Sequence, residues 1–411
     1  MESYRKLDTE GVRAWIAADA ELAALLGALP WEVREVSDGN LNAVFLAGGP
    51  AGALCVKQAL PTVRRDESWP LPLDRAKYEV AWMRAVAPHV GRAIPRLYRF
   101  DPSLYVIAME ALSPHVILRG GLIRGIRYPH AAVAVGRYVA EATFATSDLA
   151  MPFGRRFEQM ALFARNEAIL RISVDLILND PYMDSPRNRC TPGLADIAAD
   201  LRADAPLRVA AAGWGYRFLT NPQALVHGDL HSGSVMVTET DTRVIDGEFA
   251  FHGPIGFDTG AFIGNLLLSF FSQPGYATAG DDRVAYGEWV LDQIPKFWTA
   301  FRDRFLELWR AGGGGDAYRA EVFADPAGQA ALDAARLKFV DAIWADTVGF
   351  AGMKMIRRIL GYAHVADFED IADPELRAAC ERPALQMARW LVQNPCGSPS
   401  GMISGIGGVA L

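Results

Sequence analysis

Cysteine is scarce in this sequence, and its few cysteines lack the spacing that metal sites require. Cys55, Cys190, Cys380 and Cys396 are far apart and form no CxxC pair. Structural zinc sites and small disulfide-bonded domains need pairs or clusters of cysteines. We therefore expect no structural zinc, and we expect four reduced thiols in a cytoplasmic protein.

The sequence also has no excess of positive charge and no long apolar segment. The formal net charge is -7, so no global positive field would attract nucleic acid or anionic lipid. The most apolar run, residues 261–271, has about half the length that a membrane-spanning helix needs. Residues 1–16 are charged throughout and lack the apolar core of a signal peptide. These features predict neither a nucleic-acid partner nor a membrane partner.

Short strand patterns are present in the first part of the chain. Apolar and β-branched residues between turn signals predict strands at residues 31–36, 43–47, 54–59, 96–100 and 104–109. A helical pattern follows Pro72, between the third and the fourth of these segments. This order predicts a small five-stranded antiparallel sheet with one helix.

Helical spacing of apolar residues is typical of the rest of the chain. It predicts helices at residues 131–146, 157–178, 194–203, 258–271, 283–309 and 331–360, with a small group of strands near residues 224–246. Four consecutive glycines, residues 312–315, separate the last two helices. The segment 395–411 is rich in Gly and Ser, and it predicts a mobile tail.

The change from strands to helices predicts an α+β fold with two lobes. The 411 residues also exceed the about 250 to 300 residues at which single hydrophobic cores stop growing. We assign residues 1–108 to an N-terminal lobe and residues 109–113 to a linker. Residues 114–394 form a larger, mainly helical C-terminal lobe in this prediction, and residues 395–411 form the tail.

Two polar segments beside short apolar strands carry the clearest chemical signal. Residues 226–234 read VHGDLHSGS and residues 244–248 read VIDGE. Phosphoryl transfer needs an oriented acceptor hydroxyl and a divalent metal that neutralises phosphate charge. Asp229 suits the first task, because a carboxylate can take the proton of the acceptor hydroxyl. Asp246 and Glu248 suit the second, because alternate residues at a strand end can both reach a hard cation.

A His-Gly-Asp tripeptide on its own is also compatible with a turn in which the aspartate binds its own backbone. Here the tripeptide is accompanied by the acidic DxE pattern that follows a second apolar strand. This combination favours the catalytic interpretation over the turn.

The loop HGDLHSGS resembles the catalytic loop of the aminoglycoside phosphotransferase and choline kinase group, whose usual form is HGDxxxxN. Further segments narrow the resemblance to the 5-methylthioribose kinases of methionine salvage: DGNLNAVF, ESWPLPLDRAKYE, IDGEFAFHGPIGFDTGAF and RRILGYAHVADFE. These segments lie between residues 38 and 369, so the resemblance covers most of the chain. It implies a bilobal protein-kinase-like fold, ATP and Mg²⁺ as cofactors, and a homodimer.

The resemblance also implies where the nucleotide binds. The turn at residues 37–42 would cover the phosphates with backbone groups and with the side chain of Asn40. Lys57, in an apolar strand, would hold the α- and β-phosphates. Either Glu79 or Glu67 would pair with this lysine, and the sequence leaves both open.

The linker completes the nucleotide site in this interpretation. Glu110, Ala111 and Leu112 would present backbone groups to the adenine, as the linker does in related kinases. Ala111 replaces an aspartate that is usual there, but a backbone contact does not depend on that side chain. Ser234 stands where the wider group has a metal-binding asparagine, and the methylthioribose kinases resemble this chain in that respect.

Two features concern the acceptor. Arg357 and Arg358 match an arginine pair that lies at the sugar and the transferring phosphoryl group in methylthioribose kinases, although charges near a helix C-terminus also stabilise the helix dipole. Trp69, in the segment ESWPLP, resembles a mobile tryptophan loop that closes over the site. The same tryptophan is equally compatible with a hydrophobic plug at a helix N-terminus.

The function that follows is transfer of the γ-phosphate of ATP to the anomeric 1-hydroxyl of 5-methylthioribose. Asp229, Arg357 and Trp69 would contact the acceptor. The alternative acceptors are other small alcohols, such as 5-deoxyribose, choline, homoserine or an aminoglycoside. A catalytically silent nucleotide-binding protein is the remaining alternative, and the presence of Lys57, Asp229 and Asp246 speaks against it.

Overall fold

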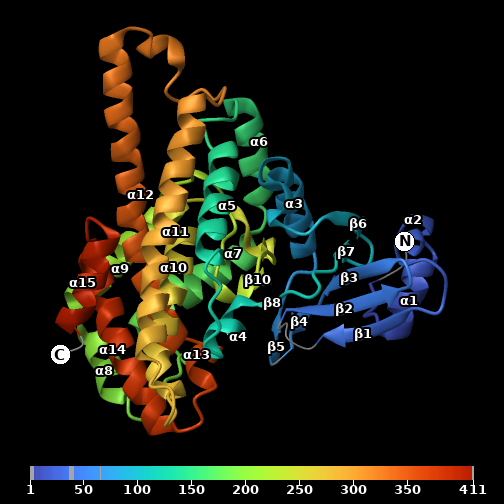
Figure 1. The fold of residues 1–411 in the computed structure, drawn as a ribbon, viewed down its shortest axis with the longest axis horizontal. Helices are drawn as coiled ribbons and strands as arrows, with labels where there is room; N and C mark the ends of the chain where they lie inside the picture. Colours follow the sequence, from blue (N-terminus) through green and yellow to red (C-terminus); the bar gives the residue numbers. More distant parts are fainter. Residues whose placement is uncertain (1–3, 37–40, 65, 410–411) are drawn as a thin grey trace.

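The computed structural model describes residues 4–36, 41–64 and 66–409. Figure 1 shows a sheet with its own helices at one end of the molecule and a larger helical body at the other. The sheet has five antiparallel strands, and the rest of the chain is mainly helical. The structure therefore confirms the predicted α+β architecture.

The N-terminal lobe contains the sheet and the helices that cover it. Its elements are α1 (Thr9–Ala17), α2 (Ala20–Leu26), β1 (Glu32–Val36), β2 (Asn42–Gly49), β3 (Gly52–Ala59), β4 (Thr62–Val63), β5 (Asp66–Pro70), α3 (Arg75–Val90), β6 (Leu97–Asp101) and β7 (Val106–Glu110). The strand order in the sheet is β1-β2-β3-β7-β6. In this order β3 lies at the centre, where Lys57 pairs with Val44 on one side and Ile107 on the other.

The two faces of the sheet contact different helices. Val56 and Val106 belong to one buried cluster with residues of α1 and α2. Ile107 belongs to the cluster that includes Val80 and Met83 of α3. Because neighbouring residues of a strand point to opposite faces, Lys57 points to the α3 side. Helices α1 and α2 were not predicted, and each is capped by an aspartate that precedes it.

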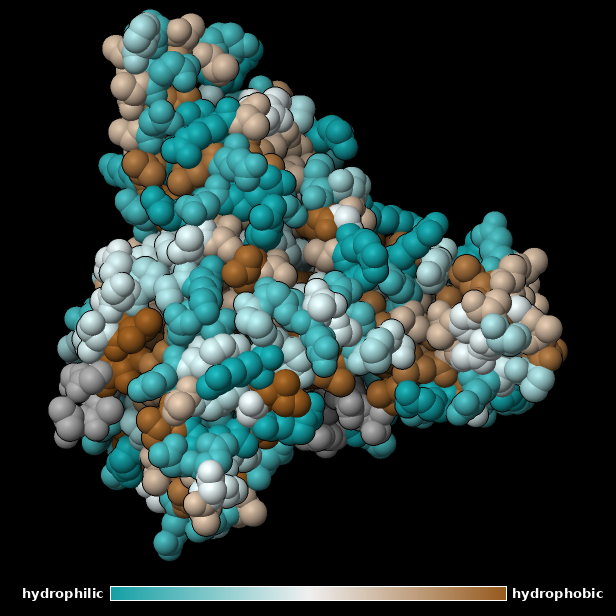
Figure 2. All heavy atoms as spheres, in the orientation of Figure 1, coloured by the Kyte–Doolittle hydropathy of each residue, from teal (hydrophilic) through white to brown (hydrophobic). Residues whose placement is uncertain are grey.

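The C-terminal part contains long helices around a small group of strands. Its helices and strands are β8 (Val116–Ile117), α4 (Leu118–Ile123), α5 (Ala131–Ala145), α6 (Phe153–Phe163), α7 (Glu167–Ser173), α8 (Ala195–Ala203), α9 (Ala205–Thr220), β9 (Ala224–Val226), β10 (Val235–Val237), β11 (Thr242–Val244), β12 (Phe251–Gly253), α10 (Ile255–Ser272), α11 (Val284–Ala311), α12 (Pro326–Leu360), α13 (Ala366–Glu369), α14 (Pro374–Gln393) and α15 (Pro399–Val409). The first turns of α12 project from the body together with the end of α11 (Figure 1), and Figure 2 shows hydrophilic and apolar residues mixed there.

Helices α10 and α12 form the centre of the helical body. Glycines at four-residue intervals on α10 allow their backbones to come close. A Cβ atom on Gly256 would lie 2.3 Å from the Cβ of Asp346, and one on Gly260 would lie 2.7 Å from the carbonyl oxygen of Thr347. This close packing fixes the position of α12, whose last two turns carry the predicted arginine pair.

The apolar character of α10 reflects its central position. The segment Ile255–Tyr276 is long and apolar enough to cross a membrane by length and composition, but 94% of its most apolar window is buried inside the protein. It is therefore the kind of helix that forms the core of a large lobe.

The predicted helix at residues 157–178 is interrupted in the structure. The chain forms α6, then a break, then α7, and it continues as a π-helix at Val174–Asn179. Asn166 lies in the break, where its side chain donates a hydrogen bond to the carbonyl of Glu248. A buried contact with another segment thus replaces a helical turn that the apolar spacing predicted.

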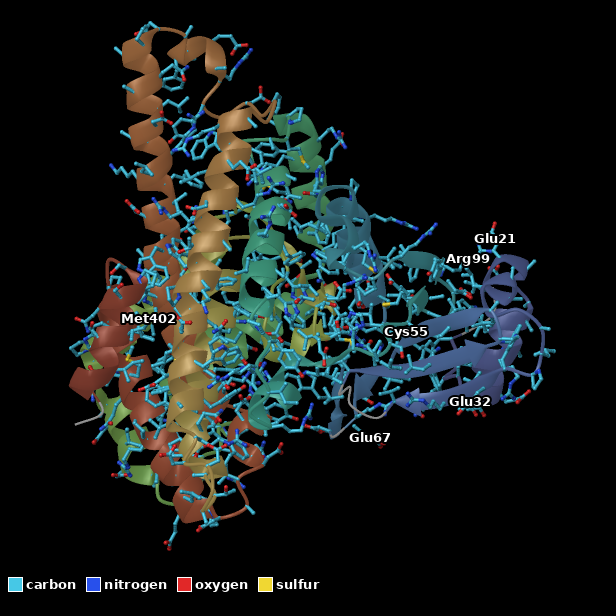
Figure 3. The ribbon with its side chains drawn as sticks, viewed as in Figure 1. Glu21, Glu32, Cys55, Glu67, Arg99 and Met402 are labelled. Carbon is cyan, nitrogen blue, oxygen red and sulfur yellow. The ribbon has the colours of Figure 1, made fainter. Side chains whose placement is uncertain are left out.

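The prediction of a mobile tail at residues 395–411 is wrong for Pro399–Val409, which form α15. Met402 and Ile406 lie four residues apart on this helix, and both are buried. Figure 3 labels Met402 within the helical body. Packing against α14 and α11 compensates for the poor helix propensity of the glycines.

The close contact between α10 and α12 can be tested with Gly260→Ala. The new methyl group would meet backbone atoms of α12, so we expect this variant to lose about 1 to 3 kcal/mol of unfolding free energy. The control is Gly213→Ala on α9, where a Cβ atom has no neighbour within 4 Å. This control should gain up to about 1 kcal/mol from helix propensity. Equal stability of the two variants in urea denaturation would contradict the packing described here.

Candidate active site

The loop after β9 is fixed by hydrogen bonds to its backbone. Asp258 at the start of α10 accepts hydrogen bonds from the amides of His227 (2.6 Å) and Gly228 (2.9 Å). Nε2 of His227 lies 2.8 Å from the carbonyl oxygen of Ile245. This contact joins the loop to the segment that contains Asp246. Gly228 has φ +85°, and a Cβ atom there would lie 2.1 Å from the carbonyl oxygen of Phe249. Only glycine fits this position.

Asp229 lies in this loop among nitrogen donors. Its Oδ2 is 3.3 Å from Nε2 of His231, and its Oδ1 is 3.3 Å from Nζ of Lys354. Arg358 approaches Oδ2 to 3.9 Å. Burial alone would raise the pKa of Asp229, but these three neighbours hold it well below the ordinary value. The carboxylate is therefore ionised and can accept a hydrogen bond.

His231 is a neutral donor in this arrangement. Its Nδ1 accepts a hydrogen bond from the amide of Gly233 (3.0 Å), so the ring proton is on Nε2 and faces Asp229. Burial lowers the pKa of His231 to about 4. Ser234 donates a hydrogen bond to the carbonyl oxygen of Asp229 (3.0 Å) and so supports the loop. Neither the role of His231 nor that of Ser234 as a loop support was predicted.

Lys57 connects α3 with the segment that follows β11. Its Nζ lies 2.9 Å from Oε1 and 2.8 Å from Oε2 of Glu79, and it also contacts Oδ1 of Asp246. Burial opposes the charge of Lys57, but Asp246, Glu79 and Glu248 together raise its pKa above the ordinary value. The structure thus selects Glu79 as the partner. Glu67 lies on the β4–β5 hairpin, away from the centre of the sheet (Figure 3).

Three carboxylates of the site lie close together. One oxygen each from Glu79, Asp246 and Glu248 lie within 4.8 Å of one another, a spacing that suits a hard cation. The Asp246 side chain is 45% exposed, so it is open to a ligand. Glu248 is buried, and it accepts hydrogen bonds from Asn42 and Arg75.

Arg75 is an important residue that the sequence did not reveal. It is fully buried at the first position of α3, where its Nε donates to Glu248 at 3.0 Å. Its other nitrogens donate to backbone carbonyls at the ends of neighbouring strands and loops: Leu41, Leu60 and Pro72. One guanidinium therefore joins α3, the sheet and the acidic cluster. Its segment, ESWPLPLDRAKYE, contributes to the family resemblance, but nothing in it assigns a role to this arginine.

The predicted arginine pair lies beside Asp229. Arg357 and Arg358 are each 8% exposed, at the end of α12. Within the described residues, Nε and one terminal nitrogen of Arg357 are buried without a hydrogen-bond partner. Burial and the charge of Arg357 lower the pKa of Arg358 well below its ordinary value. Two adjacent buried cations with unused donors form a site that favours an anion.

The β4–β5 hairpin places Trp69 against the C-terminal part of the chain. Its ring lies 5.1 Å from that of Tyr362, and the guanidinium of Arg187 lies 5.8 Å above it. Tyr362 also donates a hydrogen bond to Asp66 on the hairpin (3.2 Å). Since Tyr362 follows the arginine pair by four residues, Trp69 lies near the end of α12 that carries this pair.

The segment after β7 leaves backbone groups available. Glu110 accepts hydrogen bonds from the amide of Arg96 (3.1 Å) and from Arg243 (3.3 Å), which hold the end of β7. In the part of the chain that the structure describes, the backbone groups of Ala111 and Leu112 form no hydrogen bond. Asn40, predicted to contact phosphates, lies outside the described residues.

Known proteins resemble this chain over most of its length. Residues 32–293 match the model of the phosphotransferase enzyme family. The chain is 43% identical over 396 residues to the methylthioribose kinase of Escherichia coli O45:K1, which covers 95% of this chain and 94% of that relative. It is 41% identical over 403 residues to methylthioribose kinase 1 of Oryza sativa subsp. japonica, with 96% and 92% covered. A methylthioribose kinase of Klebsiella pneumoniae subsp. pneumoniae is 42% identical over 363 residues, with 87% of each chain covered.

The role of Arg75 can be tested with Arg75→Met. This change leaves the buried carboxylate of Glu248 without its cation, and loss of one partner from a buried pair costs about 3 to 5 kcal/mol. We expect a loss of this size in urea unfolding. Arg84→Met is the matched control, because Arg84 is exposed on the same helix and should change stability by less than about 0.5 kcal/mol. A small effect of Arg75→Met would remove Arg75 from its proposed structural role.

Proposed function

The chain belongs to the phosphotransferase enzyme family and, within it, to the methylthioribose kinases, and from this premise we propose that it transfers the γ-phosphate of ATP to the 1-hydroxyl of 5-methylthioribose. The products are 5-methylthioribose 1-phosphate and ADP. The observation that carries the proposal is an ionised Asp229 beside two buried arginines, in a chain that is 43% identical to a methylthioribose kinase over nearly its whole length.

ATP binds between the sheet and the loop after β9 in this proposal. Lys57, held by Glu79, contacts the α- and β-phosphates, and the backbone groups of Glu110, Ala111 and Leu112 bind the adenine. The free backbone groups of Ala111 and Leu112 support this assignment. The contact of Asn40 with the phosphates stays a prediction from the sequence.

Asp246 and Glu248 hold Mg²⁺ in this proposal. A carboxylate has about four acceptor positions, and the three hydrogen bonds from Asn42 and Arg75 leave one position of Glu248 free. The exposed side chain of Asp246 supplies further oxygen atoms. When bound, Mg²⁺ would neutralise charge on the β- and γ-phosphates. The residues present therefore fit the ion.

Asp229 orients the acceptor and takes its proton. Its carboxylate accepts a hydrogen bond from the 1-hydroxyl, whose oxygen attacks the γ-phosphorus. As the new O–P bond forms, the bond from phosphorus to the β,γ-bridging oxygen breaks, ADP leaves, and the hydroxyl proton passes to Asp229. The low pKa of Asp229 suits a late proton transfer, because the hydroxyl becomes acidic only as the new bond forms.

The arginine pair and the hairpin complete the site. Arg357 and Arg358 offset the negative charge of the transferring phosphoryl group, and Arg357 has unused donors for this purpose. Arg357 and Trp69 also contact the sugar, and the β4–β5 hairpin limits the access of water. The homodimer that the resemblance implies and the cytoplasmic location that the scattered cysteines indicate both remain predictions. Light scattering during size-exclusion chromatography tests the homodimer.

The choice of acceptor can be tested by measuring ADP release with a panel of alcohols. We expect kcat/KM to be highest for 5-methylthioribose, compared with 5-deoxyribose, ribose, choline, homoserine and kanamycin. A pocket for the methylthio group should contribute about 1 to 3 kcal/mol of discrimination against 5-deoxyribose, which lacks that group. Rapid turnover of another alcohol without turnover of methylthioribose would refute the proposed substrate.

The role of Asp229 can be tested with Asp229→Asn. An amide cannot take the proton, so we expect kcat to fall by about 100- to 10,000-fold. ATP affinity, measured by calorimetry without acceptor, should change little, because Asp229 is assigned to the acceptor. A variant with normal kcat would exclude Asp229 as the proton acceptor, whereas lost ATP binding would show that the substitution acts on the nucleotide site.

A further inference from the structure

Lys354 is a buried lysine to which the proposed reaction assigns no role of its own. It lies on α12 with 3% of its side chain exposed. Its Nζ is 3.3 Å from Oδ1 of Asp229, 3.4 Å from the carbonyl oxygen of Gly228, and 4.0 Å from the centre of the Phe257 ring. The ammonium group therefore contacts both the side chain and the backbone of the segment that contains Asp229.

The position of Lys354 on α12 is the second observation. Residues three and four apart on a helix share a face, so Lys354 lies on the same face as Arg357 and Arg358. The packing of α12 on Gly260 of α10 fixes this face against the loop. One helix thus presents one cation to the proposed base and two cations to the proposed phosphoryl site.

A role in packing alone does not explain a charged residue here. Methionine has a similar length, and it would fill the space beside Phe257 without the cost of burying a charge. Lys354 makes only two hydrogen bonds, and both are long, so they contribute little stability compared with the cost of burying its charge. A third cation beside two buried arginines also repels them. Its contact with Asp229 offsets these costs.

We propose that Lys354 is a positioning residue for phosphoryl transfer, which fixes the carboxylate of Asp229 so that its free acceptor positions face the acceptor hydroxyl. The inference rests on the proposed function. Asp258 holds the amides of His227 and Gly228 from one side, and Lys354 holds the carbonyl of Gly228 and the carboxylate of Asp229 from the other. Lys354 thereby couples the base to the helix that carries the arginine pair.

The charge of Lys354 depends on the groups that face it. Burial lowers its pKa to about 8, Asp229 opposes this change, and Arg357 and Arg358 add to it. Asp258, on α10, also favours the charged form. Lys354 is therefore mostly charged at neutral pH and becomes neutral as the pH rises above about 8. Loss of its proton removes the cation from Asp229, so the rate should fall on the alkaline side.

The experiment compares Lys354→Met and Lys354→Arg with the wild-type protein, with an acceptor that the wild type phosphorylates. We expect Lys354→Met to lower kcat by about 100-fold, because small displacements of a catalytic group have effects of this size. KM for ATP should stay within about threefold. The kcat of Lys354→Arg should be at least about tenfold higher than that of Lys354→Met. Its kcat should also not fall near pH 8, because an arginine stays protonated there.

Lys338→Met is the matched control, because Lys338 is exposed on the same helix. It should leave kcat and the pH profile unchanged. A folded Lys354→Met variant with normal kcat would overturn the proposal. The proposal would also fail if Lys354→Arg and Lys354→Met lost kcat equally and kept the wild-type fall in rate at alkaline pH. Absence of methylthioribose turnover in the wild type, with turnover of another panel alcohol, refutes the proposed substrate but leaves the test of Lys354 intact.

Discussion

The contact between α10 and α12 is the constraint on which the rest of the site depends. Gly256 and Gly260 have no side chains, so the backbone of α12 lies directly on α10. Asp258, between these two glycines, holds the amides of the loop that contains Asp229. The helix with the cations and the loop with the base are therefore both attached to α10. A change in this packing would alter the distance between Asp229 and its neighbours.

Around this contact the site divides into two regions of opposite charge. Glu79, Asp246 and Glu248 form the acidic region, which Lys57 and Arg75 compensate. The basic region consists of Lys354, Arg357 and Arg358, and Asp229 lies beside Lys354 and Arg358. Such a division supports the proposed reaction, in which a divalent cation would bind in the first region and the negatively charged transferring group would lie beside the second.

Sequence patterns predicted the elements whose residues carry distinctive signals. The five strands of the sheet and the DxE segment lie close to where alternation and turn residues indicated. Helices α1, α2, α9 and α14 were not predicted. For α9 the reason is that alanine and glycine are frequent and only Leu207, Ala211 and Phe218 are buried, so the apolar pattern is weak. The helix α15 was taken for a tail, because its glycines disfavour a helix in isolation and only packing of Met402 and Ile406 stabilises it.

The sequence by itself determined the family and the type of reaction, because the HGDLHSGS loop and the VIDGE segment are recognisable from residue identity and short spacing alone. Only the tertiary structure decided which charged groups meet. Glu79 rather than Glu67 pairs with Lys57, Arg75 binds Glu248 across 173 positions, and Lys354 reaches Asp229 across 125. The physical reason is that a buried charge is stable only beside a partner, and partners that are far apart in the chain leave no local pattern.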